Sequence, residues 1–154
     1  MSTKFIRAFI VIGLCSFAAF SQGKEKRFIN PEGVNKPNGF SHVVVSGGTV
    51  YISGQVSVNT KGEVIGKGDL RTQLIQVFEN LKTCLASAGL TFEDVIKTNY
   101  YVVNCKPEDV VILREVRKNY INVDSNPPAS TLVGVYSLVN PDFLVEIEMI
   151  ARLK

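Results

Sequence analysis

The chain has 154 residues, of which 45% are hydrophobic and 20% are charged; these values are typical of a globular domain and exclude a disordered or fibrous chain. The formal net charge is only +3, and no Lys- and Arg-rich run interleaves with aromatic residues, which argues against a nucleic-acid-binding protein. No uncharged apolar run reaches the ~20 residues of a membrane span, which excludes a polytopic membrane protein.

The N-terminal segment, residues 1–21, has the pattern of a signal peptide. Two basic residues precede an uncharged, mostly apolar stretch over residues 8–20, and a small-x-small site predicts cleavage after Ser21. We therefore expect an exported protein, periplasmic or secreted, without stable membrane insertion after cleavage. A single membrane anchor and a lipid-modified Cys15 are the alternatives. The mature chain would carry 15 basic and 14 acidic residues.

The mature chain is predicted to start with an irregular arm over residues 22–38, followed by one domain over residues 39–154. Strands are expected at residues 43–46 and 50–58, on either side of a Gly-Gly hairpin turn. Gly54 lies inside the second strand, where it predicts a bulge or the close approach of a backbone or ligand.

Apolar residues at spacings of three and four predict a helix over residues 69–88, with Asp69 at its N-terminus and Gly89 after its C-terminus. A strand over residues 95–103 follows, and Pro107 opens a second helix. The last two strands, residues 131–137 and 143–153, are expected to form a hairpin.

The predicted order is β-β-α-β-α-β-β, an α+β arrangement of one sheet with two helices on one face. Five apolar residues suggest that the other face is apolar too: Val44, Ile52, Val56, Val135 and Ile147. An uncovered apolar sheet needs a partner, so we expect a homo-oligomer.

Cys84 and Cys105 would both remain in an exported chain, either as a disulfide or as two buried thiols. A catalytic cysteine is disfavoured because the only histidine, His42, has no partner signature near either of them. His42 itself is interpreted as a surface or interface residue, with catalysis as the alternative. A single His with scattered carboxylates predicts no metal site.

Four sequence motifs, in order and at consistent spacing, resemble the Rid/YjgF family of reactive-intermediate deaminases, which also carries an older endoribonuclease label. They are Val50-Tyr51-Ile52-Ser53-Gly54-Gln55, the segment 79–98, Pro127-Pro128-Ala129-Ser130-Thr131 and the segment 145–151. The resemblance implies a chorismate-mutase-like α+β fold and a homotrimer whose sheets form a central barrel, with three ligand clefts between subunits. It also implies hydrolysis of short-lived enamines and imines to ketoacids and ammonia, and no cofactor.

The sequence departs from this family at two places. Deaminase members carry an arginine where this chain has Ser130, and their Gly-Pro-Tyr-Ser-Gln motif is replaced by residues 38–42, Asn-Gly-Phe-Ser-His. A serine hydroxyl cannot neutralise a carboxylate as a bidentate guanidinium does. We therefore expect a protein that binds a small metabolite without efficient deamination of 2-aminoacrylate. The alternatives are an active enamine or imine hydrolase with altered substrate choice, and a structural or chaperone-like trimer.

The resemblance transfers six ligand-binding candidates and one tentative catalytic residue to this chain. The ligand-binding candidates are Phe40, Ser53, Gly54, Gln55, Ser130 and Thr131, and the catalytic candidate is Glu146. Glu146 could hold a water molecule or accept a proton from a substrate amine. Alternatively, Glu146 pairs across an interface, and Ser130 and Thr131 only satisfy backbone groups of their loop.

Overall fold

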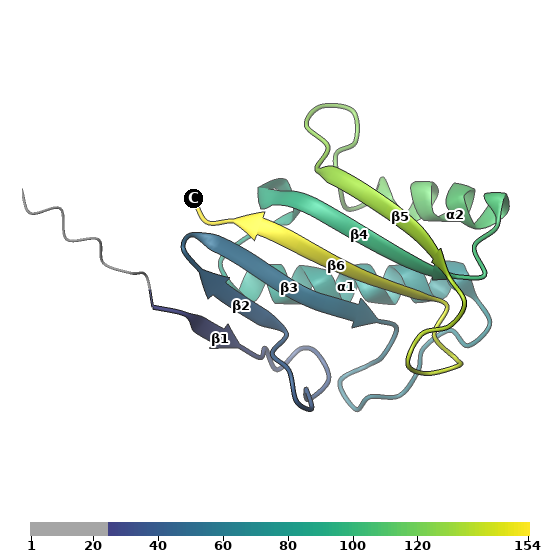
Figure 1. Cartoon of the computed structure of the whole chain (residues 1–154), viewed down its shortest axis with the longest axis horizontal. Coiled ribbons are helices and arrows are strands. Elements are labelled where there is room, and N and C mark those ends of the chain that lie inside the picture. The colour runs from purple at the N-terminus through teal and green to yellow at the C-terminus, as the bar shows by residue number, and fades with distance from the viewer. Residues whose placement is uncertain (1–24) are drawn as a thin grey trace, which may run out of the picture.

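A computed structural model describes residues 25–154 (Figure 1). The predicted signal peptide and Cys15 lie outside the described residues. The elements, in chain order, are β1 (Arg27–Ile29), β2 (Val43–Ser46), β3 (Thr49–Val56), α1 (Leu70–Ser87), the short 3₁₀ helix η1 (Phe92–Asp94), β4 (Val95–Val103), α2 (Pro107–Arg117), β5 (Ala129–Val135) and β6 (Val145–Arg152).

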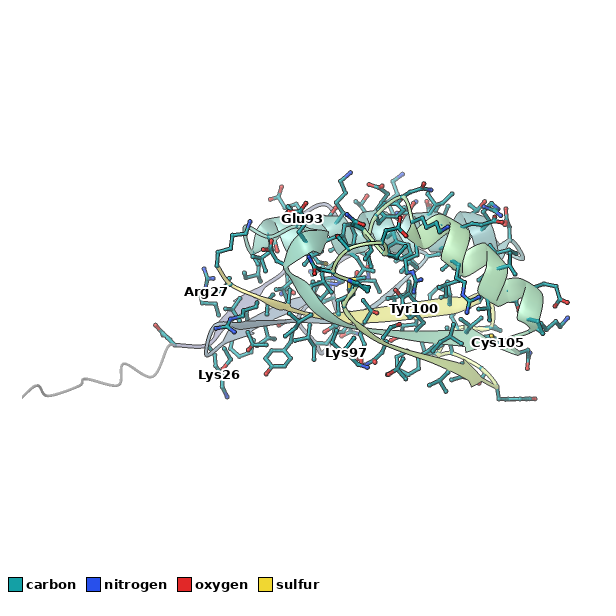
Figure 2. All side chains as sticks on the ribbon, turned by 90° about the horizontal axis from the view of Figure 1, so that it is seen from above. Lys26, Arg27, Glu93, Lys97, Tyr100 and Cys105 are labelled. Atoms are coloured by element: carbon teal, nitrogen blue, oxygen red, sulfur yellow. The ribbon has the colours of Figure 1, made fainter. Side chains whose placement is uncertain are left out.

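The six strands form one mixed sheet in the order β1-β2-β3-β6-β4-β5, and both helices pack on the same face of it (Figures 1 and 2). The α+β prediction is therefore confirmed. The hydrophobic core lies between α1 and the central strands, and its largest fully buried side chains include Leu74, Phe78, Leu81, Leu85, Tyr100, Ile147 and Met149.

The helix ends follow the sequence signals. Asp69 is the N-cap of α1, and its side chain accepts hydrogen bonds from the backbone N–H groups of Arg71 and Thr72. Gly89 has a φ of 75° just beyond the helix, a conformation that glycine adopts without steric penalty. Pro107 begins α2, as predicted.

The arm over residues 22–38 is not wholly irregular, because Arg27–Ile29 forms β1. This strand pairs antiparallel with β2, with Phe28 opposite Val44. The three residues are too few to give a period-two pattern in the sequence. They form a strand because the edge of β2 presents backbone N–H and C=O groups with which they can pair.

The predicted terminal hairpin is wrong. β5 pairs with β4 in parallel, whereas β6 lies between β3 and β4 and pairs antiparallel with both. Residues 136–144 therefore cross over β4 rather than turning back. The physical reason is burial, since the apolar residues of β6 are fully covered and need neighbours on both sides, whereas β5 is almost wholly exposed and takes the edge.

The prediction that five apolar residues lie on the open face is wrong for two of them. Ile52 and Ile147 are buried on the helix-covered face, whereas Val44, Val56 and Val135 are only partly buried. The register of β3 against β6 shifts between Ile52 and Gln55. In a regular strand, residues 52 and 56 would lie on the same face. The bulge instead places Val56 on the face opposite Ile52.

Both cysteines in the described chain are free thiols, so the disulfide alternative is wrong. Cys84 is fully buried in α1, and its burial raises the thiol pKa to about 12. Cys105, after β4, is only partly buried. The buried-thiol interpretation therefore holds fully for Cys84 alone.

Candidate functional site

The candidate site is a cavity of about 430 Å³ beside β3 and β6. Four of the predicted site residues line it: Phe40, Ser53, Gly54 and Glu146. They come from the loop before β2, the bulged part of β3 and the start of β6. The fold therefore gathers residues that are as much as 106 positions apart in the chain.

Gly54 and Glu146 lie against each other in the lining of this cavity. A Cβ atom placed on Gly54 would lie only 1.8 Å from Glu146 Oε1. The bulge predicted at Gly54 is confirmed by the register shift between β3 and β6. Glycine is thus required here for the close approach of a functional side chain rather than for an unusual backbone conformation.

The surroundings of Glu146 disfavour its charged form. Burial, and secondly the neighbouring charge of Glu148, raise the pKa of its carboxyl above the ordinary value of 4.5. Glu148 is held in place by Asn99, whose Nδ2 donates to it at 2.5 Å, and by the Tyr101 hydroxyl at 3.2 Å. A half-buried carboxyl of raised pKa can hold a water molecule or share a proton with a bound ligand.

Gln55 lies behind the cavity and does not line it. Its amide nitrogen donates to the Ser53 carbonyl at 2.9 Å and to His42 Nδ1 at 3.1 Å. On the other side of the ring, His42 Nε2 donates to the Asn35 carbonyl at 2.8 Å. Gln55 and His42 together fasten the segment before β2 to the bulge of β3.

His42 is consequently neither a surface histidine nor positioned for catalysis. It is 2% exposed, and its two ring nitrogens are used in the hydrogen bonds just described. Because the Gln55 amide nitrogen can only donate and the Asn35 carbonyl oxygen can only accept, Nδ1 accepts and Nε2 donates in these two hydrogen bonds. The ring packs edge-on against Phe40, with centroids 5.2 Å apart, and so supports one wall of the cavity.

Ser130 and Thr131 lie elsewhere, on the edge strand β5. Ser130 lines a separate cavity between β4, β5 and α2, on the helix-covered face of the sheet. Thr131 is on the open face, where its hydroxyl accepts a hydrogen bond from Lys97 Nζ at 2.5 Å. Within one chain, these two residues therefore do not meet the cavity beside Glu146.

Sequence reasoning missed the contribution of Asn35, Val139 and Phe143, which also line the cavity. Val139 and Phe143 belong to the crossover between β5 and β6. Gln73 of α1 holds this crossover by donating to the Asp142 carbonyl at 2.7 Å and accepting from the Leu144 N–H at 2.8 Å. The only sequence signal for this contact is Gln73 itself, a polar residue within the predicted helix. In the structure Gln73 is fully buried.

Among residues 25–154, no three His, Cys, Asp or Glu side chains gather as metal ligands would. In the same range, no helix combines the length and apolar character that crossing a bilayer requires.

Comparisons with a family model, with related sequences and with solved structures all lead to the same group of proteins. The family described as Endoribonuclease L-PSP matches residues 33–153. A RutC family protein of Pyrococcus horikoshii is 36% identical over 127 residues, covering 82% of this chain and 97% of that protein. A 2-iminobutanoate/2-iminopropanoate deaminase of Dermatophagoides farinae is 33% identical over 130 residues, covering 84% and 98%. Among solved structures, RidA of the Antarctic bacterium Psychrobacter sp. is similar with a TM-score of 0.73 and 31% identity, over 82% of this chain and 99% of that one.

Proposed function

Because the chain belongs to the Endoribonuclease L-PSP family, also called Rid/YjgF, we propose that it is an exported homotrimer that binds a small metabolite between subunits. We further propose that it deaminates 2-aminoacrylate poorly. Phe40, Ser53, Gly54, Gln55, Ser130 and Thr131 would bind or shape the ligand site, and Glu146 would be the residue nearest to proton transfer.

The observation that carries the proposal is the absence of arginine from β5. This strand, Ala-Ser-Thr-Leu-Val-Gly-Val, contains no basic residue. Ser130 can donate one hydrogen bond to a substrate carboxylate but brings no positive charge. A charge-assisted hydrogen bond contributes about 1.5–3 kcal/mol, against about 1 kcal/mol for a neutral one, so substrate anchoring would be weakened.

The exposure of β5 supports the homotrimer. It is an edge strand with Leu132 and Val133 exposed, and Tyr136 and Val139 just beyond it are about 90% exposed. Exposed apolar edge strands are normally covered by a partner. In such an assembly β5 of one copy, which carries Ser130 and Thr131, would lie at the boundary between subunits, where the proposed ligand clefts are.

A coupled assay tests the loss of deamination. 2-Aminoacrylate is generated by a dehydratase, and release of ammonia and ketoacid is followed with and without this protein. We expect only slight acceleration by the wild-type chain and at least a ~10-fold higher rate for Ser130→Arg, because ~1.4 kcal/mol of binding corresponds to a factor of ten. Ser130→Gln, of similar length but neutral, is the matched control. A wild-type rate as high as that of Ser130→Arg, or equal rates for the Arg and Gln variants, would contradict the proposal.

A second function, hydrolysis of a neutral or cationic imine, is favoured by the raised pKa of Glu146. Such a substrate needs no arginine, and a carboxyl that retains its proton to higher pH can serve as an acid. Assays with amine-derived imines lacking a carboxylate would reveal this activity. Its loss in Glu146→Gln would assign it to the cavity described above.

Export is tested separately by fractionating cells that express the full chain. We expect a protein in the periplasm or medium whose N-terminal residue is Gln22, from cleavage after Ser21. A full-length chain in the cytoplasm would contradict this part of the proposal.

A further inference from the structure

The cavity beside Glu146 carries charge of one sign only. Among the residues that the structure describes, its lining includes one charged side chain, Glu146, and no basic one. Asn35 and Ser53 contribute its other polar side chains, and the Ser53 hydroxyl already donates to the Ser41 carbonyl at 2.7 Å. The remaining positions are two glycines and five apolar residues, Phe40, Val56, Val58, Val139 and Phe143. A ligand in this cavity therefore meets a negative charge in mostly apolar surroundings.

Glu146 has no counterion within its own chain. It takes part in none of the ion pairs formed within residues 25–154. Burial and the charge of Glu148 raise its pKa, and in this range no basic group acts in the opposite direction. A partly buried carboxylate without a cationic partner loses solvation that nothing replaces. A ligand that brings a positive charge would compensate for this loss.

Basic groups on the neighbouring strands do not supply that charge. Lys97 lies on the open face of the sheet (Figure 2), opposite Ile150, which is four residues and therefore roughly 13 Å along β6 from Glu146. The Lys97 ammonium donates to the Thr131 hydroxyl. The edge strand β5, which the proposed trimer would place at the subunit boundary, contains no basic residue. The positive charge would therefore have to come from the ligand.

The same charges disfavour an anionic ligand. A ligand carboxylate in this cavity would lie near the carboxylate of Glu146, and the apolar lining would screen their repulsion poorly. The described lining offers no cationic side chain to anchor it. A protonated amine meets the opposite condition, because it can donate charge-assisted hydrogen bonds to Glu146.

The apolar part of the lining suits a cation that carries a hydrocarbon group. Phe40 and Phe143 both line the cavity, and the face of an aromatic ring attracts a cation. Val56 and Val58 add aliphatic surface against which a hydrocarbon group can pack. The volume of about 430 Å³ is in the usual range for small-molecule sites, so an ammonium group and a phenyl ring can be accommodated together.

We propose that the cavity beside Glu146 binds a small primary amine in its protonated form, with one apolar substituent. The ammonium group pairs with the Glu146 carboxylate, and the substituent packs against Phe40 and Phe143. This inference rests on the proposed function, which assigns ligand binding to this cavity, and it adds the charge and polarity of the ligand.

Three probes of similar size and different charge test the proposal. At pH 7, 2-phenylethylamine is a cation, 2-phenylethanol is neutral and 3-phenylpropanoate is an anion. Their binding to the mature chain, in the assembly that it forms in solution, is measured by calorimetry. We expect saturable binding of the amine, at least about tenfold tighter than that of the alcohol, and no binding of the propanoate.

Two variants and a soaked crystal assign the binding to Glu146. Glu146→Gln keeps the size of the side chain and removes its charge, so it should weaken amine binding at least about tenfold and leave alcohol binding unchanged. Glu63→Gln removes the same charge from an exposed residue next to Gly62 of the lining, and it should bind the amine as the wild-type chain does. In a wild-type crystal soaked in the amine, which does not depend on the stability of variants, we expect the ammonium nitrogen within hydrogen-bond distance of Glu146.

Four results would overturn the proposal: equal amine affinity in Glu146→Gln and wild type, propanoate binding as tight as amine binding, no binding of any probe, or an amine that lies away from Glu146 in the crystal. Preferential propanoate binding without efficient deamination of 2-aminoacrylate would refute this inference and leave the proposed function standing. Selective amine binding, together with a wild-type deamination rate as high as that of Ser130→Arg, would do the reverse.

Discussion

Gly54 illustrates how a single residue shapes the candidate site. An alanine methyl group there would overlap Glu146 Oε1, while Gly54 is not among the glycines of positive φ, so the backbone itself accepts alanine. We expect Gly54→Ala to destabilise the fold by about 1–3 kcal/mol through overpacking, measured by urea unfolding. In Glu146→Ala the carboxylate is absent, so adding Gly54→Ala to that background should cost much less. Equal costs in the two backgrounds would mean that Glu146 is not the obstacle.

Glu146 should make stability depend on pH. Its pKa is raised in the folded state by burial and by Glu148, so the folded chain disfavours the charged form. Below the ordinary pKa both states are protonated and no penalty exists; the penalty develops as the pH rises through the folded pKa. Glu146→Gln should therefore unfold at higher temperature than wild type at pH 7 and at the same temperature near pH 4. Glu32→Gln, an exposed change of the same type, should show no difference at either pH.

For single residues, the sequence predicted the roles that depend on nearby positions in the chain. Gly54 could be identified because glycine inside a β-branched strand is unusual. The buried role of His42 could not, because its partners Asn35 and Gln55 lie 7 and 13 positions away and meet it only in the folded chain. The sequence predicted four of the cavity-lining residues through family resemblance, whereas Asn35, Val139 and Phe143 lie in segments between strands and had no local pattern.

Among the elements, the crossover between β5 and β6 depends on one side chain of α1. Gln73 is fully buried, donates to the Asp142 carbonyl and accepts from the Leu144 N–H. Gln73→Leu keeps the approximate volume but leaves those two backbone groups unpaired, so we expect a loss of about 2–4 kcal/mol of unfolding free energy. Gln76→Leu, one turn later and partly exposed, should cost less than half as much. Hydrogen exchange at Leu144 should increase selectively in the Gln73 variant.

The same crossover explains why strand positions were easier to predict than strand neighbours. Alternation located β6 correctly, because its buried residues recur at every second position. Which strands become neighbours in the sheet is decided by the burial of residues that are far apart in the chain. A pattern of five or six residues does not contain this information. The terminal hairpin was therefore expected from a Pro-containing turn at residues 140–142 that in fact belongs to a crossover.

For the whole molecule, the proposed trimer predicts a sharp difference between two exposed valines. Val133 lies on the edge strand β5 and is 41% exposed, whereas Val111 lies on α2 and is 53% exposed. If β5 packs against another copy, Val133→Glu would bury a charge in that interface and dissociate the assembly. Val111→Glu adds the same charge to the helical surface and should leave it intact. Sedimentation should give three subunits for wild type and Val111→Glu, and one for Val133→Glu; a wild-type monomer, or a Val133→Glu trimer, would contradict this arrangement.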